Sequence, residues 1–273
     1  MSQKQLPRSK SRFLELRRPV SRRQAGISAV AIWVVFFSIW FIASAAGWVN
    51  DLLLPAPQKV LQTLFELIFD RDFGWDITIS VWRVVVSFTL ASLVAIPLGV
   101  MMGSFPAIEA IANPFVSAWR YLPAPSFIPI LLMWFGIGEM PKLVLLFIGV
   151  VFFLITLIMD HTKQVRGELI ETAMTLGAGR WTIVRTVILP AVMPNILIAM
   201  RQMLAVTWTY LVIAEIVAST TGIGAMMMRA RRFLHTDEIL SGIIIIGVLG
   251  LSFDLLFRSL HHWVFPYLRG RER

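Results

Sequence analysis

Charged side chains stand inside several strongly apolar stretches of this chain. Arg83 and Arg120 each lie in one such stretch, and Arg201 and Glu215 share another. An ionised group at membrane depth is costly and normally faces water, a cavity or a partner. Arg201 and Glu215 cannot pair within one helix, because 14 residues correspond to about 21 Å of helix. These residues can therefore bind a group of opposite charge, either on another helix or on a ligand.

Two interpretations of these charges stay open. Arg201 and Glu215 either form structural ion pairs with neighbouring helices or contact a translocated anion. Arg83 lies one to two turns from the outer end of its stretch, so it either snorkels to the headgroups or faces an aqueous path. Trp208 shares a helical face with Arg201 and Glu215. We hypothesise that this face lines a route for a small anion.

A proline-rich segment interrupts the stretch that contains Arg120. Pro123, Pro125 and Pro129 fall within seven residues and free several backbone carbonyls, which are tolerated at membrane depth only against protein or a water-filled cavity. We therefore expect this segment to line the route as well. The predicted lining residues here are Arg120, Tyr121, Pro123, Pro125 and Ser126.

Motifs for catalysis and for cofactor or metal binding are missing from the sequence. There is no phosphate-binding Gly-x4-Gly-Lys-Ser/Thr loop, no His-Glu-x2-His and no Gly-x-Ser-x-Gly. The chain has no cysteine, and its four histidines do not cluster with carboxylates. We predict a chain that is not an enzyme, with no catalytic residue, metal site or cofactor of its own.

The composition places these residues in a membrane protein. Of 273 residues, 57% are hydrophobic and 15% charged, against about 25% charged in a soluble domain. A spanning helix needs about 20 apolar residues. Six runs meet that need, which predicts an all-α polytopic membrane protein: Ile27 to Trp48, Ile77 to Gly103, Phe115 to Phe135, Lys142 to Met159, Val192 to Ser219 and Ile239 to Phe265.

Two local patterns refine the picture of the spans. Small residues recur at every fourth position from Ser87 to Gly103, which favours close helix packing, more within one subunit than between two. Asp254 and Arg258 stand four residues apart in the last span and can pair. Outside the spans, an amphipathic run from Val60 to Phe69 predicts a short helix along the outer membrane surface.

The distribution of charge predicts the orientation. Residues 1–24 carry eight basic residues against one acid, and residues 269–273 add three arginines. By the positive-inside rule both tails are cytoplasmic, flanking a transmembrane domain of residues 25–268. Arg229, Arg231 and Arg232, on the predicted outer side, run against this bias. The net charge of +9 is thus explained by membrane topology rather than by nucleic-acid binding.

The polar segment 166–190 lies between two apolar spans. Helix-favouring residues run from Glu168 to Leu176, Gly177 and Gly179 break the run, and an amphipathic piece from Trp181 is expected to stop at Pro190. We predict a helix, a bend and a second helix at the water boundary, in contact with a soluble partner. The alternative is an amphipathic linker that rests on the bilayer.

The order of residues in this segment resembles the EAA loop of ABC importer permeases. The pattern Glu-x-Ala-x3-Gly-x9-Val-x-Leu-Pro covers Glu171, Ala173, Gly177, Leu189 and Pro190, with Thr172 and Val187 departing mildly from the usual residues. The resemblance implies that these residues form a coupling helix seated in a groove of a cytoplasmic ATPase. ATP and Mg²⁺ would then be bound by that partner.

Two further stretches resemble the nitrate, sulfonate and taurine group of these permeases. They are LPAPSFIPILLMWFGIGE at residues 122–139 and MRQMLAVTWTYLVIAE at residues 200–215. The resemblance implies a type I ABC importer permease in the inner membrane, a homodimer surrounded by lipid, two ATPase copies and an extracytoplasmic substrate-binding protein. Sulfonate or taurine is the first choice of substrate, with nitrate, bicarbonate or another small organic solute open. An ATPase-independent carrier or channel, or a membrane scaffold, are the alternatives.

Overall fold

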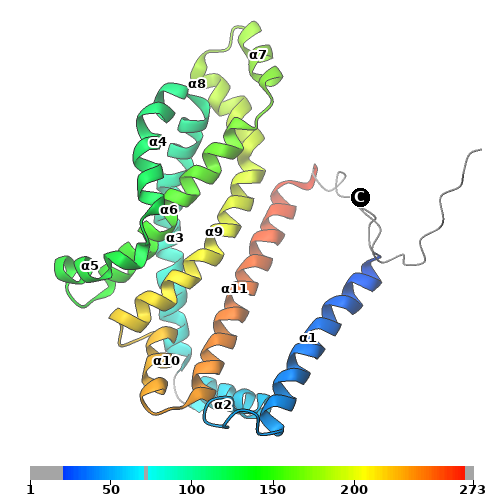
Figure 1. Cartoon of the computed structure of the whole chain (residues 1–273). Helices are drawn as coiled ribbons and strands as arrows, with labels where there is room; N and C mark the ends of the chain where they lie inside the picture. The colour runs from blue at the N-terminus through cyan, green and yellow to red at the C-terminus, as the bar shows by residue number, and fades with distance from the viewer. Residues whose placement is uncertain (1–20, 71–72, 268–273) are drawn as a thin grey trace, which may run out of the picture. The chain divides into compact units, whose positions relative to one another are not determined.

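The computed structural model describes residues 21–70 and 73–267, and every regular element in these residues is helical (Figure 1). Contacts divide the chain into two units, Met1–Pro57 and Gln58–Arg273, which are described separately. Most of the predicted N-terminal tail and all of the predicted C-terminal tail lie outside the described residues.

Five helices in the described residues are long and apolar enough to cross a membrane. Each coincides with a predicted span, within a few residues at most boundaries. They are α1 (Arg22–Ala45), α3 (Phe73–Ser104), α6 (Glu139–Lys163), the run Arg180–Ala218 that contains α9 (Leu189–Ala218), and α11 (Thr236–Val264).

The first unit is built on α1. Ser21 caps the helix by accepting a hydrogen bond from the Gln24 amide, and Gly47, at φ +67°, follows its end. The Trp40 indole donates to the Pro55 carbonyl at 3.1 Å and ties the following turn to the helix. Large apolar side chains are exposed all round α1, which is the pattern of a membrane-spanning helix.

The third predicted span is not one helix from Phe115 to Phe135. It is split into α4 (Pro106–Tyr121), the 3-10 turn η2 (Ala124–Phe127) and α5 (Ile128–Phe135), of which Ala124–Phe135 forms a shorter apolar helix. Leu122 is extended, at ψ 126°, because the ring of Pro123 excludes the helical conformation from the preceding residue. The predicted interruption is confirmed, and it ends α4 outright.

Helices α3, α6 and α9 form the core of the second unit. A Cβ atom at Gly99 would lie 2.8 Å from the side chain of Ile158, and one at Gly149 would lie 2.5 Å from the ring of Tyr210. The glycines therefore let α3 approach α6 and let α6 approach α9. This confirms that the small-residue stripe of α3 packs within the subunit.

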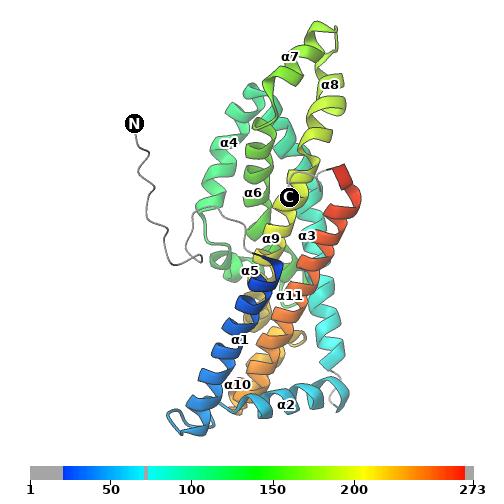
Figure 2. The same cartoon turned by 90° about the vertical axis from the view of Figure 1, so that its right-hand side faces the viewer.

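The short helices mark the two ends of this unit. Helix α2 (Pro57–Asp70) runs across the direction of α11 (Figure 2) and is held there by Thr63, which donates to Asp237 at 2.9 Å. Helix α10 (Ile223–Arg232) packs near the same end. Helices α7 (Gly167–Thr175) and α8 (Arg180–Ile183) lie at the opposite end. We call these the α10 end and the α7 end.

Candidate functional site

The segment predicted to meet a soluble partner projects past α4 and α6 in both views (Figures 1 and 2). Helix α7 ends in a tight turn in which Gly177, at φ +79°, donates to the Met174 carbonyl, and Ala178 donates to that of Ala173. The predicted break at Gly177 is confirmed. Glu171 lies exposed on α7, and Ala173 is half-buried.

Apolar side chains of this segment are left uncovered. Met174, Leu176 and Trp181 are 58%, 81% and 57% exposed. An exposed apolar cluster rimmed by polar residues is typical of a protein contact surface. We name Gly167–Ile183, which is exposed at most positions, the coupling segment.

Pro190 does not end the second helix, contrary to the prediction. Residues Val184–Ile188 form a π-helical turn, in which the Leu189 amide donates to the Val184 carbonyl, and the chain continues as α9 through both Pro190 and Pro194. A π turn accommodates the proline because its wider spacing tolerates the missing N–H and the ring. Leu189 and Pro190 therefore belong to the start of a long helix, joined without interruption to α8.

Arg83 occupies neither of its predicted environments. Its side chain is fully buried, and all five of its N–H groups donate hydrogen bonds. Two reach the carboxylate of Glu139 at 2.7 Å each, one reaches Glu215 at 2.6 Å, and two reach the carbonyl and hydroxyl oxygens of Thr221 at 2.9 and 3.0 Å. Arg83 is thus held by protein rather than by headgroups.

Glu215 is equally well satisfied. It accepts hydrogen bonds from the Ser80 hydroxyl at 2.7 Å and from the Gly224 amide at 2.8 Å, besides that from Arg83. The Gly222 amide donates to Asp76, which also pairs with Arg229 at 2.8 Å. These contacts join α3, α6, α9 and α10 near the α10 end. We name Arg83, Glu139 and Glu215 with their partners the buried ion cluster.

Arg201 finds a partner on another helix, as one of the two interpretations predicted. Its guanidinium lies 3.3 Å from Asp254 of α11, and Arg258 pairs with the other oxygen of that carboxylate at 2.7 Å. The predicted pairing of Asp254 with Arg258 is confirmed. We name Arg201, Asp254 and Arg258 the charged triad.

The proline-rich residues form a third, separate group. The Arg120 guanidinium lies 5.3 Å from the ring centroid of its neighbour Tyr121. Tyr121, Pro123 and Ser126 are exposed, and Pro125 is half-buried. No hydrogen bond within the described residues joins this group to Arg83 or Arg201. The structure therefore distributes the predicted path residues over three places.

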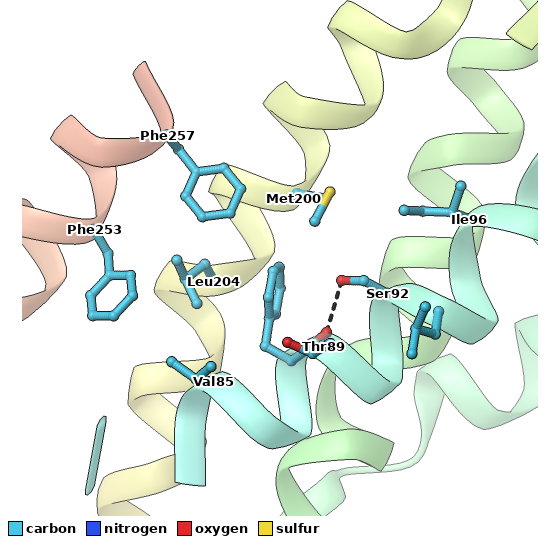
Figure 3. Close-up of a pocket in the computed structure, with 10 residues that line it drawn as sticks. Val85, Thr89, Ser92, Ile96, Met200, Leu204, Phe253 and Phe257 are labelled. Carbon is cyan, nitrogen blue, oxygen red and sulfur yellow. Dashed lines mark hydrogen bonds between the residues drawn. The ribbon is translucent and has the colours of Figure 1, made fainter. Parts of the chain in front are cut away.

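An apolar cavity of about 350 Å³ opens between α3, α9 and α11 (Figure 3). Its wall includes Met200 and Leu204 of α9 and Phe253 and Phe257 of α11. Trp208 packs on Phe253 with the ring centroids 5.9 Å apart. No group of three His, Asp or Glu residues is placed to hold a metal ion within the part of the chain that the structure describes.

Sequence reasoning missed the acceptors that hold Arg83. Glu139 and Glu215 are 56 and 132 positions away along the chain, so no local spacing connects them to Arg83. Glu139 did carry one signal, its position directly after the turn at Gly136–Gly138, where α6 begins. The buried ion cluster therefore became recognisable only in three dimensions.

Known proteins resemble this chain over most of its length. It is 32% identical over 262 residues to the taurine transport system permease protein TauC of Escherichia coli, covering 94% of each chain. It is 30% identical to the putative aliphatic sulfonates transport permease protein SsuC of Bacillus subtilis, covering 90% of this chain and 91% of the relative.

A solved structure shares the fold. It is described as an inward-facing conformation of the MetNI methionine ABC transporter, and one of its chains matches with a TM-score of 0.57 at 19% identity, over 70% of this chain and 99% of that one. The fold is thus that of a type I ABC importer permease. Residues 95–270 match the family described as binding-protein-dependent transport system inner membrane component, so the chain belongs to this family of multi-pass ABC importer permease subunits, whose ATPase is a separate subunit.

Proposed function

We propose that this permease imports a small organic anion, with a sulfonate such as taurine as the first choice, driven by ATP hydrolysis in its partner ATPase. The similarity to taurine and aliphatic sulfonate permeases across nearly the whole chain supports this choice. A bicarbonate transport system permease of Synechococcus elongatus, 26% identical over 84% of this chain, keeps bicarbonate as a competing substrate. Nitrate stays open from the motif resemblance alone. The family assignment favours ATP-driven import over a secondary carrier, a channel or a scaffold.

The observation that carries the proposal is the coupling segment. Its surface includes the exposed apolar side chains of Met174, Leu176 and Trp181, and the segment lies at the α7 end of the unit (Figure 1). We propose that this surface seats in a groove of the ATPase, with the Glu171 carboxylate and the Gly177 turn fixing the orientation of α7. Because α8 continues through the π turn into α9, a movement of the ATPase is passed through Leu189 and Pro190 to a membrane-spanning helix.

The proposal includes an orientation and an assembly. The α7 end faces the cytoplasm and the α10 end faces the substrate-binding protein, with both termini cytoplasmic. Two copies of the chain enclose the route in the inner membrane, among lipids, and Arg120, Tyr121, Pro123, Pro125 and Ser126 line it together with Arg201 and Trp208. Arg83 and Glu215 hold the helices at the outer end of this route. The basic N-terminal tail supports this orientation.

Reconstitution tests the function. The tagged chain is purified from its native membrane with its ATPase, placed in liposomes with its binding protein, and supplied with labelled taurine, ethanesulfonate, nitrate or bicarbonate. We expect ATP-dependent, vanadate-sensitive uptake of a sulfonate. Preferential uptake of nitrate or bicarbonate would overturn the substrate assignment, and purification without any ATPase would overturn the coupling role.

Substitution of Gly177 by Val tests the coupling segment. Gly177 has φ +79° and open space around it, so a β-branched side chain strains the turn without a clash inside the chain. We expect uptake to fall at least about tenfold, a cost of ~1.4 kcal/mol in the coupled step, while the amount of protein in the membrane stays unchanged. Gly74→Val, outside the coupling segment at the start of α3, is the matched control, because Gly74 is also exposed and uncrowded and lacks a positive φ. Equal uptake by both variants argues against docking through this turn.

A further inference from the structure

The charged triad lies deep in the predicted membrane region. Arg201 is 12 residues from the start of α9, and Asp254 is 10 residues from the end of α11. At 1.5 Å per residue these separations are about 18 and 15 Å, roughly half of the hydrocarbon thickness. Arg258 is only six residues from the end of α11, about 9 Å, and brings the net charge of the triad to +1. Such a charge needs water or an anion nearby.

The triad has hydrogen-bond donors to spare. Each oxygen of Asp254 contacts one arginine, Arg201 at 3.3 Å and Arg258 at 2.7 Å, in both cases through Nε. No side chain or carbonyl within residues 21–70 and 73–267 accepts from the terminal nitrogens of either guanidinium. The side chains of Arg201 and Arg258 are 31% and 56% exposed. The fork of N–H groups that binds two oxygens of a carboxylate or of a tetrahedral oxyanion such as phosphate is therefore presented outward.

Two orphaned polar groups lie on the same helix faces. The indole N–H of Trp208 and Nε2 of His261 are buried and have no hydrogen-bond partner within the described residues. Trp208 is seven residues beyond Arg201, and His261 is seven residues beyond Asp254, which is close to two helical turns in each case. Buried polar groups are normally satisfied. Because α9 and α11 run in opposite directions (Figure 1), Trp208 and His261 lie on opposite sides of the triad, so water or ligand at two separate points of this seam is needed to satisfy them.

An apolar cavity lies at the level of the charged triad along α9 and α11, although no triad residue lines it. Phe253 and Phe257 immediately precede Asp254 and Arg258, and Met200 immediately precedes Arg201. These three apolar side chains line the cavity of about 350 Å³ between α3, α9 and α11 (Figure 3). A site for a small organic ion combines a few polar groups with an apolar wall of this kind.

We propose that the seam between α9 and α11 is a binding site for a small organic oxyanion of the alkanesulfonate class. Arg201 and Arg258 bind the anionic oxygens, Asp254 is a positioning residue that holds the two guanidiniums together, and the aromatic wall accommodates the organic body. This binding site rests on the proposed function, and it adds Arg258 and Asp254 to the residues that we propose for anion transport. It also separates these residues from Arg83, whose donors are all used within the protein.

The lack of cysteine in the chain allows a direct test. A single cysteine replaces Ala205, an exposed residue one turn beyond Arg201, in the permease purified with its ATPase. Its rate of modification is measured with an anionic sulfonatoethyl and a cationic trimethylammonioethyl methanethiosulfonate. Gln62→Cys, on the exposed polar face of α2, supplies the reference ratio. A change in the thiolate fraction of the cysteine alters the rates of both reagents alike. The ratio of the anionic to the cationic rate therefore reports the local electrostatic potential.

We expect the anionic reagent to be favoured about tenfold over the reference ratio, and Arg201→Gln or Arg258→Gln to lower that preference about threefold each. Ethanesulfonate should slow the modification, whereas added phosphatidylglycerol should not. If Arg201→Gln fails to fold, the labelling ratio of Arg258→Gln still tests the site, because Arg258 is half-exposed.

Three results overturn the site. They are no modification by either reagent, a ratio equal to that of Gln62→Cys, and protection by the anionic lipid alone. The labelling ratio requires no transport. Absence of sulfonate uptake by the unsubstituted importer would therefore count against the proposed function while leaving this measurement interpretable.

Discussion

Two clusters of arginines and carboxylates differ in how completely their charges are satisfied. In the buried ion cluster, Arg83 is fully buried and uses every N–H group. In the charged triad, Arg201 and Arg258 are partly exposed and share one carboxylate. An arginine that is saturated by its own chain has nothing left for a ligand. This difference supports a structural role for the first cluster and the binding role that we propose for the second.

The two clusters also differ in what they connect. The buried ion cluster joins three long helices and the start of α10 at one end of the unit. The charged triad joins only α9 and α11, deep in the span. A cluster that fixes several helices resists movement. Between α9 and α11 the only ion pair that crosses the two helices in the described residues is the 3.3 Å contact of Arg201 with Asp254, beside the packing of Trp208 on Phe253, so fewer polar contacts have to break for these two helices to separate. A permease that changes conformation needs both properties, in different places.

Arg83→Met should have the largest effect on stability. It leaves the buried Glu215 without its cation, and breaking a buried pair on one side costs about 3 to 5 kcal/mol. Thermal unfolding in detergent measures the loss. Arg232→Met, at an exposed position of α10, is the control and should stay within about 0.5 kcal/mol. Equal unfolding temperatures for the two variants would remove the structural role from the buried ion cluster.

Gly222→Ala should destabilise the same cluster less strongly, by about 2 to 3 kcal/mol. Gly222 has φ +103°, and a Cβ there would meet the carboxylate of Glu215 and lie 2.6 Å from Arg83. Gly177→Ala shares the positive φ but has open space, so it should cost only about 1 kcal/mol. The difference between these two unfolding free energies isolates the crowding at the cluster. Equal losses of unfolding free energy in the two variants would show that the buried ion cluster accommodates the added Cβ without a measurable cost.

Local signals in the sequence predicted much of this fold. Apolar runs located the spans because a membrane dictates their length, and Gly177 located the turn after α7. The pairing of Asp254 with Arg258 was predictable because the two are one helical turn apart. Each of these features depends on residues close together in the chain.

Features that depend on distant contacts were not predictable in the same way. Proline usually stops a helix, yet the π turn before Pro190 absorbs it, and nothing in the local sequence distinguishes the two outcomes. Arg83 could be placed in a span but not given its partners, which come from α6 and α9. Whether an arginine keeps N–H groups without an acceptor likewise depends on how the helices pack, which the local sequence does not determine.

Arg258→Gln should have the smallest effect on stability, and the sign of that effect distinguishes a water-facing triad from a lipid-facing one. If the charged triad faces water, as the binding site requires, removal of a half-exposed ion pair changes the unfolding free energy by no more than about 0.5 kcal/mol. If Arg258 instead faces lipid, removing its charge relieves a cost of about 2.5 kcal/mol or more and should stabilise the protein. Thermal unfolding of Arg258→Gln beside Arg83→Met separates these cases, because a wet site predicts a near-neutral change and a lipid-facing arginine predicts a gain.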